Sequence, residues 1–419
     1  MRYKSSNFPP IISIAARFLH IFSVHLHFNA SLINQRFLMK THPRIIVAMD
    51  SLKGSADSHA AGQAVARGLA DAWPEADVSV LALGDGGEGT APTLAAALHG
   101  QPVHCTVPGP LGARVEATYY VCHNTVVMDM AQASGLCLVE PVLRNPLRTS
   151  SAGTGTMIMH AVVHGCREII LGIGGSATVD GGMGMLSAMG ALFTDKDGKM
   201  LQPCGAALPL VARADLSGVP QAVRDVRITV ACDVNNALCG PQGAARVFGP
   251  QKGAAPEDVE ELDAGLSIFA DAIDRATGTD MRRTEGAGAA GGIGYALAAV
   301  TGARLTRGID LVLDTLGFDS LLRGASLVVT GEGCLDRQTL MGKAPCGVLR
   351  RARMQGVPVV ALGGRVTDAG ELLDAGFAAV LPIVEGPCPL CEAIRPDTAL
   401  DNLRRTALMV GRLAGLMRE

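Results

Sequence analysis

The stretch Ile169-Ile170-Leu171-Gly172-Ile173-Gly174-Gly175-Ser176-Ala177-Thr178-Val179-Asp180-Gly181-Gly182 decides the fold of this chain. Its apolar start predicts a buried strand, its glycines predict a turn, and the pattern from Met183 to Leu192 predicts a helix. Unpaired N–H groups at a helix N-terminus, together with the hydroxyls of Ser176 and Thr178, suit a phosphate or a carboxylate. We therefore predict an anion site in this loop, with Gly174 and Gly175 in it and Asp180 adding a charge.

The same order of strand, glycine-containing turn and helix occurs near the start of the regular sequence. Residues 45–49 predict a buried strand, and residues 58–72 predict a helix with Ser55 or Asp57 as its N-cap. A second strand over residues 78–83 leads into a glycine-rich turn and a helix that ends at Leu98. Repeated βα units indicate a mostly parallel sheet.

The pattern changes in the middle of the chain and returns near its end. Residues 103–130 alternate apolar and polar side chains around two turns, which predicts antiparallel hairpins. Strand patterns followed by glycine reappear at residues 326–330 and 357–362. We therefore predict an α/β protein of two α/β domains. The first has a mostly parallel sheet and comprises residues 44–100 plus 295–419, and the second, with a mixed sheet, is inserted as residues 101–294.

The N-terminal residues differ in character from the rest. No Asp or Glu occurs before Asp50, and an apolar run from Ile11 to Ala16 is followed closely by Arg17 and His20. This pattern fits neither a transmembrane helix nor a signal peptide. An organelle transit peptide has the same acid-poor character, but we expect translation to begin at Met39. Residues 1–43 are then an extension that is disordered or not translated.

Composition excludes several classes of function. The net charge of −3 and the scarcity of aromatic residues argue against a nucleic-acid partner. Eleven cysteines without paired metal-ligand spacing favour a reducing cytoplasm over a disulfide framework, and the single Cys388–Cys391 pair is interpreted as two ordinary thiols. Nothing indicates a membrane partner, and a homo-oligomer remains open.

Acidic and basic side chains follow the predicted strands at five places. The carboxyl ends of strands face the ligand crevice in open α/β sheets, so these side chains could converge. Phosphoryl transfer needs carboxylates for magnesium, lysines for the phosphates and a base for the attacking hydroxyl. The groups concerned are Asp50/Lys53, Asp85/Glu88, Asp180, Asp233, and Glu332/Asp336 with Lys343.

Three further motifs bear on ligand binding. Residues 330–343 resemble a phosphate-binding loop through Gly331 and Gly333, but they lack P-loop spacing. Arg144 and Arg148 precede a predicted helix and could hold a substrate carboxylate. Residues 286–291 match GxGxxG, but no strand precedes them, so helix packing explains these glycines better than a dinucleotide.

Taken together, the ordered motifs resemble those of the bacterial type I glycerate kinases, from about Arg44 to the C-terminus. Two departures are visible, since the N-terminal extension has no counterpart and Leu52 stands where the family usually has Phe. The motifs that carry the resemblance are Asp50–Gly54, Asp85–Thr90, Arg144–Leu147, Gly174–Gly182, Ala231–Val234, Phe248–Gly253, and Thr330–Gly333 with Asp336, Gly342 and Lys343.

The resemblance implies magnesium- and ATP-dependent phosphorylation of D-glycerate in a two-domain protein with the active site between the domains. One domain would be flavodoxin-like, and the product is mostly 2-phosphoglycerate in glyoxylate or sugar-acid catabolism. From chemistry, we assign Asp180 or Asp233 as general base. Lys53 and Lys343 would neutralise phosphate, with Ser51 and the glycines of both loops beside it. Asp85, Glu88, Glu332 and Asp336 would support magnesium, and Arg144 or Arg148 would bind the carboxylate.

Alternatives remain at this point. The product could be 3-phosphoglycerate, because no residue identifies the hydroxyl that is phosphorylated. A non-catalytic sugar-acid sensor would keep the carboxylate site but lose the acids of phosphoryl transfer, all of which are present. A nicotinamide dehydrogenase is disfavoured by the missing strand before residue 286.

Overall fold

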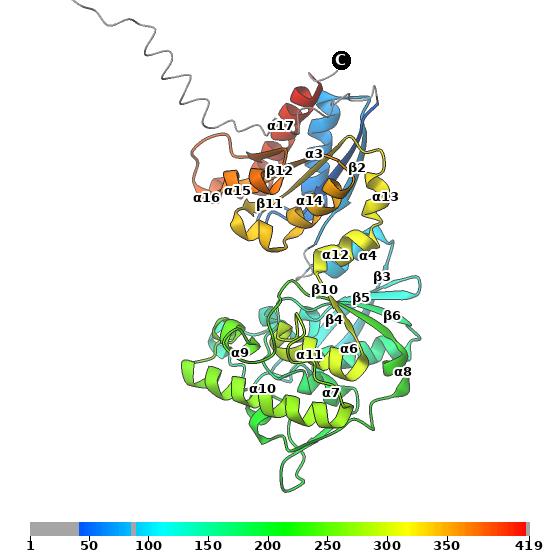
Figure 1. Cartoon of the computed structure of the whole chain (residues 1–419), viewed down its shortest axis with the longest axis vertical. Helices are drawn as coiled ribbons and strands as arrows, with labels where there is room; N and C mark the ends of the chain where they lie inside the picture. The colour runs from blue at the N-terminus through cyan, green and yellow to red at the C-terminus, as the bar shows by residue number, and fades with distance from the viewer. Residues whose placement is uncertain (1–41, 85–88, 416–419) are drawn as a thin grey trace, which may run out of the picture.

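The computed structural model describes residues 42–84 and 89–415 and consists of two lobes, each built around its own sheet (Figure 1). Apart from His42 and Pro43, the predicted extension lies outside the described residues. So do Asp85 and Glu88, two of the predicted magnesium ligands.

The first lobe has a five-stranded sheet, here called sheet 1, in which every neighbouring pair is parallel. The strand order β13-β12-β11-β1-β2 is the flavodoxin-like order, with its topological switch point between β1 and β11. The expected flavodoxin-like α/β domain is thus confirmed. Its strands are β1 (Arg44–Met49), β2 (Asp77–Ala82), β11 (Leu327–Leu335), β12 (Val359–Val366) and β13 (Ala379–Pro382).

Helices cover both faces of sheet 1 because its strands are apolar on both sides. Ile45 and Val47 of β1 pack in one buried cluster with α3 and α17, whereas Ile46 and Ala48 belong to a second cluster with α12, α13, α14 and α15. The helices are α3 (Ser58–Ala72), α12 (Gly308–Thr315), α13 (Phe318–Leu322), α14 (Ala344–Met354), α15 (Ala369–Ala375), α16 (Leu390–Ala393) and α17 (Pro396–Gly415).

Helix α3 illustrates how local sequence sets an element. The Asp57 side chain accepts a hydrogen bond of 2.7 Å from the N–H of Ala60, as an N-cap does. Ala61, Val65 and Leu69 recur every four residues and are fully buried. The sequence prediction of this helix and of Asp57 as a cap candidate is confirmed.

The second lobe has a six-stranded mixed sheet, here called sheet 2, in the order β10-β9-β6-β5-β4-β3. The pairs β3–β4 and β4–β5 are antiparallel, as the alternating residues 103–130 predict, and the remaining pairs are parallel. The strands are β3 (Gln101–Pro108), β4 (Arg114–Cys122), β5 (Thr125–Asp129), β6 (Glu168–Gly172), β9 (Arg227–Ala231) and β10 (Arg304–Thr306). A separate hairpin pairs β7 (Leu192–Thr194) with β8 (Arg213–Asp215).

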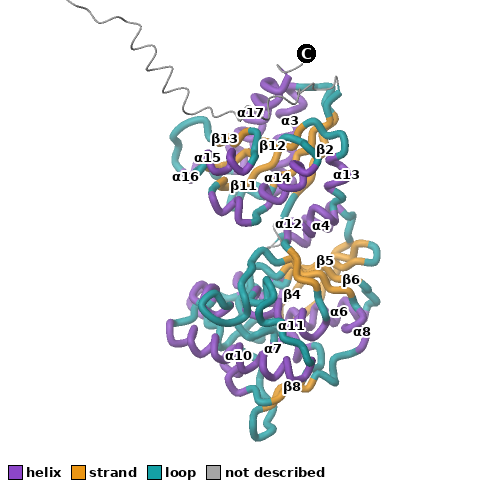
Figure 2. Tube along the Cα trace, in the orientation of Figure 1, coloured by secondary structure: helices purple, strands orange, loops and turns teal. Residues whose placement is uncertain are grey.

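Helices also pack on sheet 2 (Figure 2). On one face α6, α7, α10 and α11 contribute to the buried core of the lobe, and on the other α4 packs with Val127 and Ile170. These helices, with the shorter ones, are α4 (Thr90–Ala97), α5 (Ala131–Ser134), α6 (Ala152–Val163), α7 (Met183–Ala188), α8 (Gln221–Asp225), α9 (Ala244–Phe248), α10 (Pro256–Thr277) and α11 (Ile293–Thr301). Among the described residues, no helix combines the length and the apolar character needed to cross a membrane.

Both connections between the lobes leave from the carboxyl end of a strand. The chain passes from β2 to α4 on its way into the second lobe, and from β10 to α12 on its way back (Figure 1). The carboxyl edges of the two sheets are therefore directed toward each other. In addition, α4 and α12 contribute to one buried apolar cluster that includes residues of both sheets.

Two local expectations need correction. The helix predicted from Met183 to Leu192 ends at Ala188, because Gly190 has φ +105° and a Cβ there would come 2.3 Å from Gly218 O. Most of helix α11 and all of β10 fall in the range expected for the first domain, but α11 packs in the core of the second lobe and β10 pairs with β9.

Candidate functional site

The switch point of sheet 1 brings together two of the predicted loops. Asp50 follows β1, and its N–H donates to Gly331 O of β11 at 3.0 Å. A Cβ on Gly333 would lie 3.5 Å from the backbone nitrogen of Lys53, so the end of β11 runs beside the loop after β1. Because ligands of such sheets bind outside the strands at the switch point, these loops form one half of a candidate site.

Lys343 lies beside this switch point, between two carboxylates. Its Nζ is 3.3 Å from Glu332 Oε2 and 3.9 Å from Asp336 Oδ1, and about a third of its side chain is exposed. Burial raises the pKa of the Glu332 carboxyl, while the hydrogen bond from Thr339 Oγ1 and the charge of Lys343 oppose that rise. Lys343 is thus both partly accessible and fixed in position.

The same contacts bear on the predicted magnesium ligands. In this structure Glu332 and Asp336 flank a lysine, and Asp336 also caps a 3-10 helix, Arg337–Met341, by accepting from two of its N–H groups. No group of three or more His, Cys, Asp or Glu side chains in residues 42–84 and 89–415 could hold a metal ion. Because Mg²⁺ is often held by one or two carboxylates together with substrate phosphates, the role of Glu332 and Asp336 as magnesium ligands stays a prediction.

The glycine loop after β6 forms the other half of the site, at the carboxyl edge of sheet 2. It is fastened on one side by backbone bonds, in which Leu136 N–H donates to Gly175 O and Ala177 N–H donates to Ser134 O. The Thr149 hydroxyl donates to Ala177 O at 2.9 Å. The N–H groups of Gly174 and Gly175 have no hydrogen-bond partner within the described ranges, and Gly175 is exposed. These two N–H groups remain available to an anion.

Asp180 is fully buried and acts as an internal anchor. Its Oδ2 accepts from the N–H and the hydroxyl of Ser151 at 2.8 and 2.7 Å and from Gly184 N–H at 3.1 Å, and its Oδ1 accepts from Gly182 N–H at 3.1 Å. Burial raises the pKa of the Asp180 carboxyl, and these four hydrogen bonds oppose the rise. A carboxylate with no exposed surface cannot reach a substrate hydroxyl in this structure, so it does not fit the role of general base.

The hydrogen bonds of Asp180 and Ser151 also change where the predicted anion site can lie. The N–H of Gly184 in the first turn of α7 is bound by Asp180, and that of Met185 is bound by the Ser151 hydroxyl at 2.9 Å. The N-terminus of α7 is therefore not open to a ligand. What remains of the predicted anion site is the start of the loop, at Gly174 and Gly175, rather than the helix that follows it.

Asp233, the other base candidate, is exposed after the end of β9. Its Oδ1 accepts from the N–H of Gly308 at 3.0 Å, and Gly308 begins α12, the helix that returns the chain to the first lobe. This hydrogen bond orients the carboxylate at the junction between the lobes. Of the two acids, Asp233 is the one that a bound substrate could contact.

The two predicted arginines lie in a segment that adjoins the glycine loop through Thr149. Arg144 is half-buried, and its Nε donates to Val139 O at 3.4 Å, whereas Arg148 is exposed. With respect to residues 42–84 and 89–415, both arginines keep guanidinium donors for a carboxylate, and their role stays a prediction.

The GxGxxG segment serves packing, as expected from its missing strand. A Cβ on Gly288 would lie 2.3 Å from Ala237 O, and one on Gly291 would lie 2.0 Å from Thr178 O. The segment thus fits between the loops that follow β6 and β9, and it holds both in place.

Sequence reasoning missed two residues. Asp129, 2% exposed, accepts from the N–H groups of Gly89 and Ala91 and so caps α4 at the first crossing between the lobes. The one sequence feature that points to Asp129 is its position as the last residue of an apolar strand. Lys252 lies against the glycine loop, and its motif, Phe248–Gly253, was noted without a role for the lysine.

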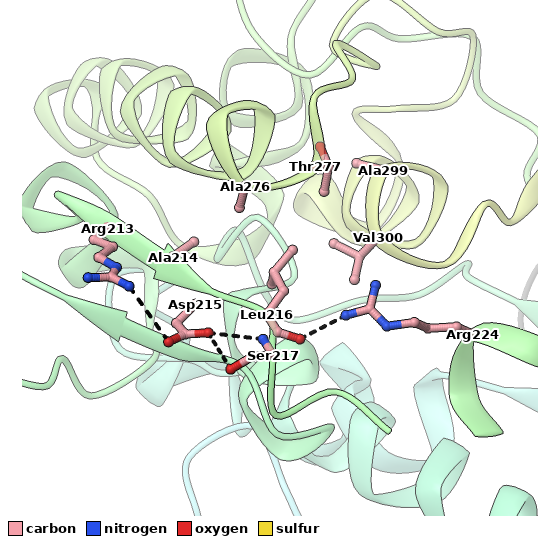
Figure 3. A pocket seen from close by; sticks show the side chains of 10 residues that line it. All are labelled: Arg213, Ala214, Asp215, Leu216, Ser217, Arg224, Ala276, Thr277, Ala299 and Val300. Carbon is pink, nitrogen blue, oxygen red and sulfur yellow. Dashed lines mark hydrogen bonds and ion pairs between the residues drawn. The ribbon is translucent and has the colours of Figure 1, made fainter. Parts of the chain in front are cut away.

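A pocket of about 570 Å³ occurs elsewhere, in the second lobe between β8, the end of α10 and α11 (Figure 3). Its polar side chains mostly bind one another or the backbone. Asp215 accepts from Ser217 and lies 3.9 Å from Arg213, and Arg224 donates to Leu216 O at 2.8 Å. None of the predicted site residues lines it, so it is not part of the candidate site.

Comparison with known proteins gives a consistent result. The model of the glycerate kinase family matches residues 45–415. The glycerate kinase of Bacillus subtilis (strain 168) is 44% identical over 367 residues, which are 87% of this chain and 96% of that protein. The glycerate 2-kinase of Escherichia coli (strain K12) is 41% identical over 367 residues, with the same coverage of both.

A solved structure also matches. A crystal structure from Salmonella typhimurium LT2 that bears the name glycerate kinase 2 superimposes with a TM-score of 0.81 at 42% identity. The match covers 90% of this chain and 99% of that one.

Proposed function

The chain belongs to the glycerate kinase family, and we propose that it transfers the γ-phosphoryl group of ATP to a hydroxyl of D-glycerate. One observation carries the proposal beyond the family. The carboxyl edges of the two sheets are directed toward each other. One edge carries a lysine-bearing pair of loops, and the other carries a loop with two N–H groups that bind no other described residue. A phosphoryl donor and a small anionic acceptor are the pair of ligands that such an arrangement suits.

ATP is proposed to lie at the switch point of sheet 1. Ser51, Gly331 and Gly333 would be next to its phosphates, and Lys53 and Lys343 would neutralise their charge. Lys53 is exposed, and Lys343 is held at its place by Glu332 and Asp336. A lysine already fixed by carboxylates meets the triphosphate with little loss of side-chain entropy. We propose magnesium–ATP as the form of the donor, and Asp85 and Glu88 remain proposed contacts of the ion.

D-glycerate is proposed to lie opposite, at the start of the glycine loop. The N–H groups of Gly174 and Gly175 would bind the carboxylate of D-glycerate. Ser176 and Thr178 follow them in the same loop. Arg144 or Arg148 would bind the same carboxylate from another side, because a guanidinium can donate two parallel hydrogen bonds to it.

Asp233 is proposed as the general base. Its carboxylate would accept the hydroxyl proton while the hydroxyl oxygen forms a bond to the γ-phosphorus, and the bond from that phosphorus to the bridging oxygen breaks to release ADP. The hydrogen bond from the N–H of Gly308 to Oδ1 orients this carboxylate at the junction between the lobes. Fixing the base in this way contributes to the rate because proton transfer needs hydrogen-bond geometry.

We propose 2-phosphoglycerate as the product, supported by the relative named glycerate 2-kinase. A role in glyoxylate or sugar-acid catabolism and a cytoplasmic location belong to the same proposal. The eleven cysteines all lie within the described residues and none of them forms a disulfide there, which fits a reducing compartment.

A phosphorus NMR time course of the full chain with D-glycerate, ATP and magnesium tests the reaction and its position together. A 2-phosphoglycerate signal is expected. A 3-phosphoglycerate signal would retain the kinase and correct the orientation of the substrate. A folded protein that binds glycerate without any transfer would instead be a sensor.

The base is tested by Asp233→Asn, which keeps an oxygen to accept from Gly308. We expect kcat to fall by about 10²–10⁴-fold with the midpoint of thermal unfolding nearly unchanged. An Asp233→Asn enzyme with normal kcat would remove Asp233 from the mechanism.

A further inference from the structure

Lys252 is a buried charged residue that the proposed reaction does not yet use. It ends a short 3-10 helix, Pro250–Lys252, directly after α9, and only 3% of its surface is exposed. Lysine is almost never buried to this extent unless partner groups satisfy its ammonium. Its surroundings therefore indicate what the burial achieves.

The partners of Lys252 lie in the glycine loop, more than seventy residues earlier in the chain. Its Nζ donates to Ser176 Oγ at 2.6 Å and to Thr178 O at 2.7 Å. Residue Ala177 between them is held from the other side by Ser134 and Thr149. The stretch 176–178 is thus fixed between the lysine and two other segments.

Electrostatics adds a second link. Burial lowers the pKa of the Lys252 ammonium to about 7, and the negative charge of Asp180 opposes that shift. Asp180 in turn binds the N–H groups that follow the loop, at Gly182 and Gly184. Lys252 and Asp180 therefore hold the middle and the end of the loop in place, whereas the N–H groups of Gly174 and Gly175 at its start bind no other residue that the structure describes.

We propose that Lys252 is a positioning residue, which fixes Ser176 and Thr178 so that the N–H groups of Gly174 and Gly175 stay directed at the anionic group of glycerate. This proposal rests on the proposed function for the identity of the ligand. It does not make Lys252 a catalytic residue, because the buried ammonium contacts the loop rather than a bound molecule. Its contribution is to the conformation in which the loop meets the substrate.

The test compares Lys252→Met with Lys196→Met in the full chain. Met keeps much of the length and apolar volume of the lysine but removes both hydrogen bonds. Lys196 is an exposed lysine in the turn between Asp195 and Gly198, so its variant controls for the loss of a positive charge. Two readouts are taken for each variant: hydrogen–deuterium exchange of the peptide that spans residues 174–182, and KM for D-glycerate and for magnesium–ATP.

We expect Lys252→Met to raise exchange in this peptide and KM for D-glycerate by about tenfold or more, because a hydrogen bond from a charged group is worth at least about that factor. KM for ATP should change less than about threefold, since the proposed ATP site lies on the other sheet. Lys196→Met should leave all three quantities unchanged. A purely stabilising lysine would lower the unfolding midpoint without this split between the two KM values, and that result would overturn the proposal.

A second variant covers the case in which Lys252→Met does not fold. Ser176→Ala removes one acceptor and leaves Lys252 bound to Thr178 O. It should raise exchange of the peptide and KM for D-glycerate in the same direction by a smaller factor, and unchanged exchange would overturn the proposal. If the wild-type chain does not phosphorylate glycerate, the proposed function fails, and the exchange measurement still decides whether Lys252 fixes the loop.

Discussion

Replacing Asp180 with Asn should destabilise the second lobe strongly, although the two side chains have nearly the same shape. The carboxylate accepts four hydrogen bonds and donates none, from Ser151, Gly182 and Gly184. An amide has one accepting atom and one donating group. If the amide oxygen of the new side chain accepts from the three donors that bind Oδ2, the NH₂ group faces the N–H of Gly182. These two donors then face each other, and neither has an acceptor.

The size of the effect follows from these contacts. One charge-assisted hydrogen bond is lost, three become neutral ones, and Lys252 loses the opposite charge that supports its ammonium. A buried polar group left without its hydrogen bond typically costs about 1–3 kcal/mol, and two such groups would be left here. We therefore expect a loss of about 3–5 kcal/mol in the free energy of unfolding, with the activity falling in parallel as the loop loses its anchor.

Urea unfolding followed by circular dichroism measures this loss, with Asp233→Asn as the matched control. The control changes an exposed carboxylate that keeps its hydrogen bond to Gly308, so its unfolding midpoint should stay close to that of the wild type. Asp180→Asn should thus lower mainly the free energy of unfolding, whereas Asp233→Asn should lower mainly kcat. An Asp180→Asn protein of wild-type stability with a selectively reduced kcat would refute the reasoning and restore Asp180 as the base.

Three further predictions concern Lys252, the packing glycines and Lys343. Burial lowers the pKa of Lys252 to about 7, so between about pH 7 and 10.4 the unfolded chain binds more protons than the folded one. The free energy of unfolding should therefore rise with pH in this range. Urea titrations at several pH values should show a smaller rise for Lys252→Met. Gly291→Ala places a Cβ 2.0 Å from Thr178 O and should lower the midpoint of thermal unfolding strongly. Gly302→Ala is the control, because Gly302 has a similar φ but no atom within 4 Å of the added Cβ, so only the backbone strain of about 1–2 kcal/mol is expected. Equal losses of stability in the two variants would contradict the packing role. Lys343→Gln should raise KM for ATP by about tenfold or more in steady-state kinetics and leave KM for glycerate unchanged. A higher KM for glycerate with an unchanged KM for ATP would contradict the proposed ATP site at sheet 1.

The sequence was sufficient for features that depend on neighbours along the chain. Helix α3 and its Asp57 cap follow from apolar spacing and a short polar side chain, and the hairpins of residues 103–130 follow from alternation. Glycines marked the loops at the strand ends, because few other residues permit such turns. Local patterns of this kind are fixed by backbone geometry, so they can be read without the fold.

The distinction between Asp180 and Asp233 depended on the tertiary structure. Both acids follow a strand of sheet 2 in loops of similar composition, yet one is fully buried among four donors and the other is exposed at the junction of the lobes. Burial is set by segments from elsewhere in the chain, here Ser151 and the glycines of residues 286–292. Lys252 meets Ser176 for the same reason, since no local pattern encodes a contact across that separation.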